Sequence, residues 1–182
     1  MTLNDLENYI KCCQKCDLCK TRTNVVAGDG NPNAKIMFVA EAPGKYEDLQ
    51  GRTFVGPSGK VLDKLLSNIG LSRDEIFISN ILKCRPPENR NPTPQEQELC
   101  MPYLRAQFKL IKPKMVVCLG RIAAQRIIDS NFKITKQHGT FIQKGDTIFT
   151  ATYHPSAVLR YPENESIAIQ DFNKIKEKIA EF

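Results

Sequence analysis

Four short apolar segments that alternate with helical patterns constrain the fold of this chain most. They read KIMFVA (35–40), EIFISNIL (75–82), KMVVCLG (114–120) and TIFTATY (147–153). Short apolar runs bounded by Gly or Pro are typical of buried strands. Helical patterns cover 60–69, 93–111, 121–130 and 165–182, and FIQKGDTIF resembles a hairpin. This alternation predicts a three-layer α/β/α sandwich around a central, mainly parallel four-stranded sheet.

Length, cysteine content and charge narrow the class of protein. The chain has 182 residues, which we expect to form a single domain over 1–182. It shows no signal peptide and no run long enough to span a membrane, so we expect no membrane association and a cytoplasmic, reducing location. Seven cysteines in such a compartment indicate metal or redox chemistry rather than disulfides. The net charge of +6 suits a polyanionic partner, although solubility alone can also explain it.

The stretch KCCQKCDLCK concentrates four of these cysteines near the N-terminus. Cys13 and Cys16 are spaced so that two thiolates can bind one metal, and Cys19 lies at the same spacing from Cys16. Cys84 ends the second predicted strand, and Cys100 lies in the helix that follows. A pair from the N-terminal group with Cys84 and Cys100 makes a four-thiolate set, which suits a structural zinc or a [4Fe–4S] cluster. Spacing alone does not choose between them, and unligated thiols are the simpler alternative.

The segments after the predicted strands hold residues that a core does not explain. In parallel sheets, sites lie beyond the carboxyl ends of the strands. EAPG after the first strand supplies Glu41 and Gly44, and Asn80 lies at the end of the second strand, where a buried amide needs partners. His154 follows the last strand and precedes a proline, which projects its ring at the mouth of the sheet. His138, in a polar loop, receives no functional role.

Phe54 lies between glycines in GRTFVGPSGK. This position suits an exposed aromatic face for stacking, and packing beneath the loop is the competing interpretation. The following GPSGK opens a helix, whose N-terminal amides suit a phosphate group.

Four blocks in order resemble the family 4 uracil-DNA glycosylases, the iron–sulfur members of the uracil-DNA glycosylase superfamily. The blocks are EAPGKYEDLQGRTFVGPSG, SNILKCRPPENRNP, KPKMVVCLGRIAA and ATYHPSAVLR, and the resemblance covers about residues 10 to 161. It implies a [4Fe–4S] cluster of structural role on Cys13, Cys16, Cys84 and Cys100. Cys12 and Cys19 are then extra cysteines.

The resemblance also implies an enzyme that flips uracil out of DNA and hydrolyses its N-glycosidic bond, leaving an abasic site. His154 would stabilise charge on the leaving base, Asn80 would bind its hydrogen-bonding edge, and Glu41 would orient water. Ala42 stands where related families carry a water-activating aspartate. The implied uracil-binding residues are Ala42, Gly44, Glu47, Phe54, Asn80 and His154, with Phe54 stacking on the ring and Glu47 screening its C5 side.

Contacts with DNA are expected from Ser58, Lys60, Lys83, Arg85, Ser156 and Arg160, with Val158 or Leu159 as the wedge that fills the vacated stack. Two positions depart from the resemblance. Ala40 replaces a usual glycine, and we expect its methyl group either to narrow the approach of the sugar-phosphate or to shift Glu41. Thr53 replaces a usual proline, which we expect to loosen the loop slightly.

Uracil-containing DNA is therefore the expected partner of a monomeric enzyme, and a sliding clamp or other replication and repair proteins are further candidates. Two alternatives remain open: a relative that binds or traps uracil-DNA with little turnover, and a metal-stabilised nucleic-acid-binding module. The loop KCRPPENRNP contains no histidine, which counts against the branch of the superfamily that crosslinks to uracil-DNA through a histidine in this loop.

Overall fold

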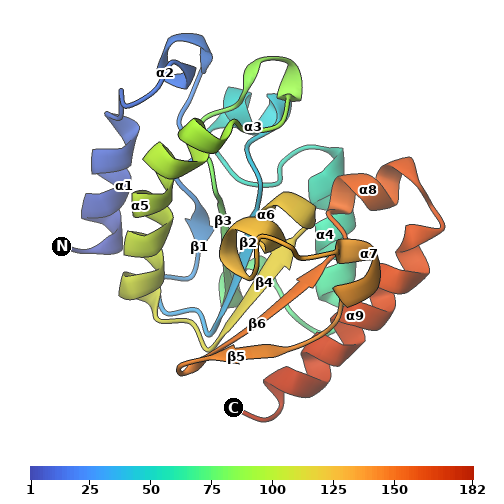
Figure 1. The fold of residues 1–182 in the computed structure, drawn as a ribbon. Helices are drawn as coiled ribbons and strands as arrows, with labels where there is room; N and C mark the ends of the chain where they lie inside the picture. Colours follow the sequence, from blue (N-terminus) through green and yellow to red (C-terminus); the bar gives the residue numbers. More distant parts are fainter.

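A computed structural model describes residues 1–182, and its centre is a six-stranded sheet in the order β1-β3-β2-β4-β6-β5 (Figure 1). The parallel strands are β2 (Ile36–Ala40), β3 (Ile76–Asn80), β4 (Met115–Leu119) and β6 (Thr147–Thr152). They correspond to the four predicted strands. Two antiparallel edge strands extend the sheet: β1 (Asp29–Gly30) and β5 (Ile142–Lys144). The expected four-stranded sheet therefore lacks the two edge strands. One of them, β5, pairs with β6 in the expected hairpin.

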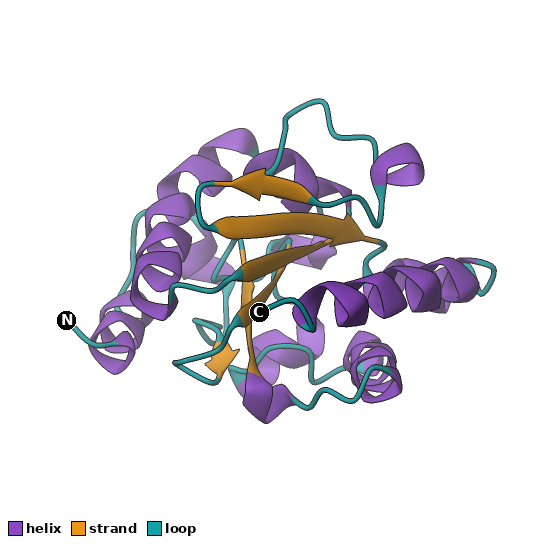
Figure 2. Ribbon diagram, turned by 90° about the horizontal axis from the view of Figure 1, so that it is seen from below, coloured by secondary structure: helices purple, strands orange, loops and turns teal.

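Helices cover both faces of this sheet, as the sequence predicts (Figure 2). Side chains alternate across a strand, so Met37 and Val39 of β2 join one core while Ile36 and Phe38 join the other. The first core receives α1 (Leu3–Lys11), α5 (Pro94–Ile111) and α6 (Arg121–Ile127). The second receives α4 (Pro57–Asn68), α8 (Pro155–Arg160) and α9 (Asn164–Ile179). Shorter helices are α2 (Leu18–Thr21), α3 (Lys45–Gln50), α7 (Ile134–Gln137), η1 (Arg73–Glu75) and η2 (Pro87–Asn89).

The start of α5 follows from local chemistry. The Thr93 hydroxyl accepts from the Glu96 amide at 3.2 Å, and the Glu96 carboxylate accepts from the Thr93 amide at 2.9 Å. This reciprocal capping satisfies two amides that the first turn leaves free, and Pro94 has no amide to satisfy. The predicted helix at 93–111 is confirmed. None of the helices combines the length and the apolar surface that crossing a bilayer requires.

His138 has a structural contact that the sequence did not indicate. Its Nδ1 lies 2.9 Å from the carboxylate of Asp171, which is fully buried in α9 and also accepts from the Thr152 hydroxyl at 2.7 Å. Asp171 lies within the apolar stripe of α9, where a carboxylate needs such partners. The contact ties the segment after α7 to the helix that covers the second core.

Candidate active site

A pocket of about 530 Å³ opens where the parallel strands end. Glu41 follows β2, Asn80 ends β3, Arg121 follows β4 and His154 follows β6, and all four line the pocket. Segments far apart in the sequence thus meet at one edge of the sheet, as parallel topology requires. The pocket also brings together the predicted residues Ala42, Gly44, Glu47, Phe54, Ser58, Ser156 and Arg160.

The protonation of His154 is set by the start of α8. Its Nδ1 lies 3.0 Å from the Ser156 backbone amide and 2.8 Å from the Ser156 hydroxyl. A backbone N–H can only donate, so Nδ1 is an acceptor and the proton of the neutral ring lies on Nε2. Burial lowers the pKa of His154 to about 4. The ring is therefore neutral at pH 7, and it places an Nε2–H donor at the pocket.

Phe54 combines the two positions considered from the sequence. The expectation of an exposed face is wrong, because Phe54 is only 6% exposed and packs in the second core. It nevertheless lines the pocket, and its ring centroid lies 5.6 Å from that of His154 with an angle of 28° between the planes. The Phe54 ring is thus a sheltered wall of the pocket.

Asn80 and Glu41 bring unused polar groups to the same space. Asn80 is 3% exposed and lines the pocket. Its side-chain amide is not among the fully buried polar groups that lack a hydrogen-bond partner, so the amide is accessible from the pocket. Burial raises the pKa of Glu41, and the Arg121 guanidinium opposes that shift. No role was predicted for Arg121 from the sequence. The Gly-Arg pair directly after a buried strand is the pattern that could have indicated one.

Two departures from the resemblance have consequences other than those expected. Thr53 does not loosen its loop, because its amide and hydroxyl both donate to Asp29 Oδ2, at 2.7 and 2.6 Å, and a proline could do neither. Ala40 is fully buried in the second core and is not part of the pocket wall, so its methyl group does not narrow the pocket directly.

Some residues expected at the DNA lie outside the pocket. Lys60 and Leu159 are exposed, whereas Val158 is buried and unsuited to act as a wedge. Arg85 donates to the Asn89 side chain at 2.7 Å beside the pocket wall, which includes Asn89 itself.

The structure contradicts the expected DNA contact of Lys83. This residue is 1% exposed, and its ammonium donates to the Ser79 hydroxyl, the Asn80 carbonyl and Gln107 Oε1 at 2.5 to 2.8 Å. A lysine directly after an apolar strand can turn back beneath the sheet edge, which its sequence position does not reveal. Lys83 instead holds the end of β3, next to Asn80.

We expect Gln107→Leu to destabilise the fold by about 3 kcal/mol, because it leaves a buried ammonium short of an acceptor. Gln107 Oε1 accepts from both Lys83 and Ser79, and its amide donates to the Ala27 carbonyl at 2.7 Å. Denaturant unfolding measures the change. Gln95→Leu on the exposed face of the same helix is the control, and equal stability of the two variants would contradict the assigned contacts.

A second pocket collects the cysteines of the predicted metal set. Cys13, Cys16, Cys84 and Cys100 line it, and Cys19 lines it as well, so Cys19 is closer to the set than expected. Cys12 is exposed and lies outside it. No three Cys, His, Asp or Glu side chains come close enough together to hold a single metal ion.

The walls of this cysteine pocket are apolar and cationic. Burial raises the pKa of Cys84 to about 11, and it also raises the pKa of Cys100. Arg22 Nη1 donates to Cys84 Sγ at 3.1 Å, and the Lys83 amide donates to Cys100 Sγ at 3.3 Å. Apolar surroundings disfavour free thiolates, while these donors favour negative charge on sulfur, which is the setting of bound thiolates.

Several known proteins are similar to this chain over most of its length. Residues 27–180 match the model of the uracil DNA glycosylase superfamily. The chain is 47% identical over 184 residues to a type-4 uracil-DNA glycosylase of Archaeoglobus fulgidus, covering 97% of this chain and 92% of that protein. A type-4 uracil-DNA glycosylase of Sulfurisphaera tokodaii is 44% identical, covering 97% of this chain and 84% of that protein. Another, of Thermotoga maritima, is 43% identical, covering 92% of this chain and 89% of that protein.

Proposed function

Because this chain belongs to the uracil DNA glycosylase superfamily, and type-4 members align with nearly its whole length, we propose that it excises uracil from DNA in DNA repair. The enzyme is a hydrolase that leaves an abasic sugar. The observation that carries the proposal is the neutral His154, whose Nε2–H donor shares the pocket with Asn80 and Phe54.

The pocket residues suit a flipped uracil. An extruded base is bound by stacking and by hydrogen bonds to its Watson–Crick edge. Phe54 supplies the stacking surface, and the open Asn80 amide supplies one donor and one acceptor, which match the N3–H and an adjacent carbonyl of uracil. Glu47 and Gly44 line the same pocket and are our candidates for the wall that excludes a C5 methyl group.

The chemistry then follows from charge. As the bond between C1′ and N1 breaks, its electron pair leaves with uracil and negative charge spreads onto the carbonyl oxygens. The His154 Nε2–H donates to one of these oxygens and lowers the barrier. Water adds to C1′, and the proton that it releases balances the negative charge on uracil, which leaves as the neutral base. Glu41 orients that water, and the neighbouring Ala42 has no group that could act as a base.

DNA contacts are proposed for Ser58, Ser156 and Arg160, which line the pocket, and for Lys60, Arg85 and Leu159 around it. Leu159 is 48% exposed and is the candidate wedge. A monomeric state, a cytoplasmic location and recruitment by a sliding clamp or another repair protein remain predictions from the sequence.

We also infer that Cys13, Cys16, Cys84 and Cys100 hold a [4Fe–4S] cluster, which supplies a structural cross-link when bound. The four cysteines line one pocket, and the similarity of the chain to type-4 uracil-DNA glycosylases supports an iron–sulfur group there. The cross-link joins the N-terminal segment to the end of β3 and to α5.

A uracil-excision assay tests the function. Intact, anaerobically purified protein is incubated with a labelled oligonucleotide that contains one uracil, then with alkali, and a thymine oligonucleotide serves as control. Strand breakage at uracil alone is expected. An intact strand that stays bound to the protein would instead favour the trapping alternative.

We expect two acid limits in the pH profile of single-turnover excision. Burial raises the pKa of Glu41 above its ordinary 4.5, so its carboxylate is lost first as the pH falls. His154 becomes protonated only near pH 4, and its Nδ1 then no longer accepts from Ser156. In Glu41→Gln the remaining limit should lie near pH 4. A limit near 6.5 in that variant, lost in His154→Gln, would contradict the lowered pKa of His154. A rate that rises as the pH falls through that range would contradict the neutral donor.

A further inference from the structure

The loop of residues 51–56, here called the pocket loop, joins α3 to α4 and carries Phe54 in a strained conformation. Phe54 has a φ of 49°, in the left-handed region that bulky side chains rarely occupy. Its carbonyl passes so close to α4 that a Cβ on Gly59 would lie 1.8 Å from the oxygen. A conformation of this kind persists only where its surroundings hold it in place.

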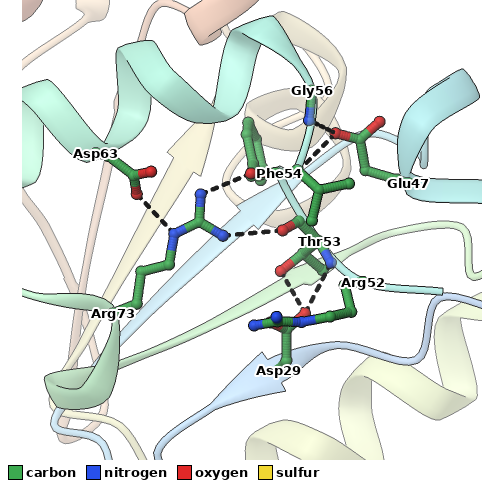
Figure 3. A network of polar contacts seen from close by, with 9 residues as sticks. Asp29, Glu47, Arg52, Thr53, Phe54, Gly56, Asp63 and Arg73 are labelled. Atoms are coloured by element: carbon green, nitrogen blue, oxygen red, sulfur yellow. Dashed lines mark hydrogen bonds and ion pairs between the residues drawn. The ribbon is translucent and has the colours of Figure 1, made fainter. Parts of the chain in front are cut away.

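Arg73 of η1 holds the carbonyl groups on this loop (Figure 3). Its Nη1 donates to the Thr53 carbonyl at 3.0 Å and its Nη2 to the Phe54 carbonyl at 2.6 Å. The third donor, Nε, binds Asp63 of α4 at 2.6 Å. The planar fork of one guanidinium therefore fixes two successive peptide groups and ties them to the next helix.

Two carboxylates hold the amide groups of the same loop. Asp29 of β1 accepts from both donors of Thr53, and Glu47 of α3 accepts from the amides of Val55 and Gly56, each at 3.0 Å. Figure 3 shows these acidic side chains and Arg73 converging on the loop from separate elements. Backbone groups on both sides of Phe54 are thus bound by charged side chains, whose hydrogen bonds are stronger than neutral ones.

We propose that Arg73 and Asp29 are positioning residues that hold Phe54 in the conformation in which its ring forms the pocket wall beside His154. Neither residue lines the pocket, so their effect on substrate passes through Phe54. This inference rests on the proposed function, in which uracil stacks on that ring. Preorganisation matters here because a free loop would leave the strained conformation and lose the stacking surface before uracil enters.

The first test is a double-mutant cycle on uracil excision. Arg73→Met should lower kcat/KM about tenfold, which is the scale of a lost stacking contact. In a Phe54→Ala background the same change should lower it less than twofold, because the ring that Arg73 positions is absent. Arg73→Lys should lie between Met and the wild type, since an ammonium cannot bind both carbonyls and Asp63 in the same geometry.

Arg126→Met is the matched control. Arg126 is 28% exposed and pairs with an exposed carboxylate, that of Glu98, whereas Arg73 is 26% exposed and pairs with Asp63. Arg126 has no contact with the pocket loop. Equal losses in Arg73→Met and Arg126→Met would overturn the proposal, as would a loss from Arg73→Met that is unchanged in the Phe54→Ala background.

A second measurement does not depend on catalysis. The chain contains no tryptophan, so Phe54→Trp places a single tryptophan on the pocket loop, which can be excited apart from the five tyrosines. Acrylamide should quench this reporter severalfold more strongly when Arg73→Met or Asp29→Asn is added, and Arg126→Met should leave quenching unchanged. Unchanged quenching in the Arg73 and Asp29 variants would overturn the positioning role. If the wild type fails to excise uracil, the proposed function falls, and this fluorescence result still decides whether the two residues hold the loop.

Discussion

Replacement of His154 by alanine is expected to lower the single-turnover rate of uracil excision by roughly 10²–10³-fold, the cost of removing one donor from a site of developing negative charge. His154 Nδ1 is occupied by the Ser156 amide, so the donor that the variant loses is the Nε2–H at the pocket. The affinity for uracil-DNA should change much less, because the interaction strengthens as the bond to the sugar breaks. Rapid-quench measurement of cleavage, together with a binding titration, separates these two effects.

His138→Ala is the control for this prediction, since it removes the other histidine of the chain. Its partner Asp171 lies in the second core, so the variant should melt at a lower temperature and still cleave at the normal rate below that temperature. A cleavage rate in His154→Ala within about threefold of the wild type would contradict electrostatic stabilisation by His154, because a lost donor of this kind costs far more.

Strand positions and the pocket residues at strand ends could be predicted from the sequence because they depend on local patterns. Asn80 and His154 lie at or just after buried strands, and parallel topology brings such ends together whatever the rest of the chain does. Lys83 could not be placed in the same way. Its side chain turns inward to Gln107, a residue 24 positions away, and only the packed structure supplies that acceptor.

The conformation of the pocket loop is a second feature that could not be predicted from the sequence. The sequence shows an aromatic residue between glycines. It does not show the left-handed φ of Phe54 or the hydrogen bonds from Arg73 and to Asp29 that fix the loop, because these depend on contacts between distant segments. Thr53 illustrates the difference, since propensity alone predicted a looser loop than proline would give. The hydrogen bonds of Thr53 to Asp29 reverse that expectation, because a specific tertiary contact outweighs a local backbone preference.

The second large effect is expected from the cysteine pocket. Cys100→Ser should lose the iron, the visible absorbance of the cluster and most of the activity, because the pocket wall formed by Pro86, Asn89 and Arg90 begins just after Cys84. Without the cross-link, this segment is tied to α5 only through its remaining contacts, such as the pair between Arg90 and Glu96 at 2.7 Å. Iron and sulfide analysis, absorbance and excision rate are measured on the same anaerobic preparations.

Cys12→Ser and Cys13→Ser form a matched pair of neighbouring changes in this experiment. Cys12 is exposed and lies outside the cysteine pocket, so its variant should keep full iron content, whereas Cys13→Ser should behave like Cys100→Ser. Cys19→Ser decides whether the fifth pocket cysteine is a ligand, and we expect it to retain the iron. A wild-type protein that contains one zinc ion and neither iron nor sulfide would overturn the cluster, as would equal iron content in the Cys12 and Cys13 variants.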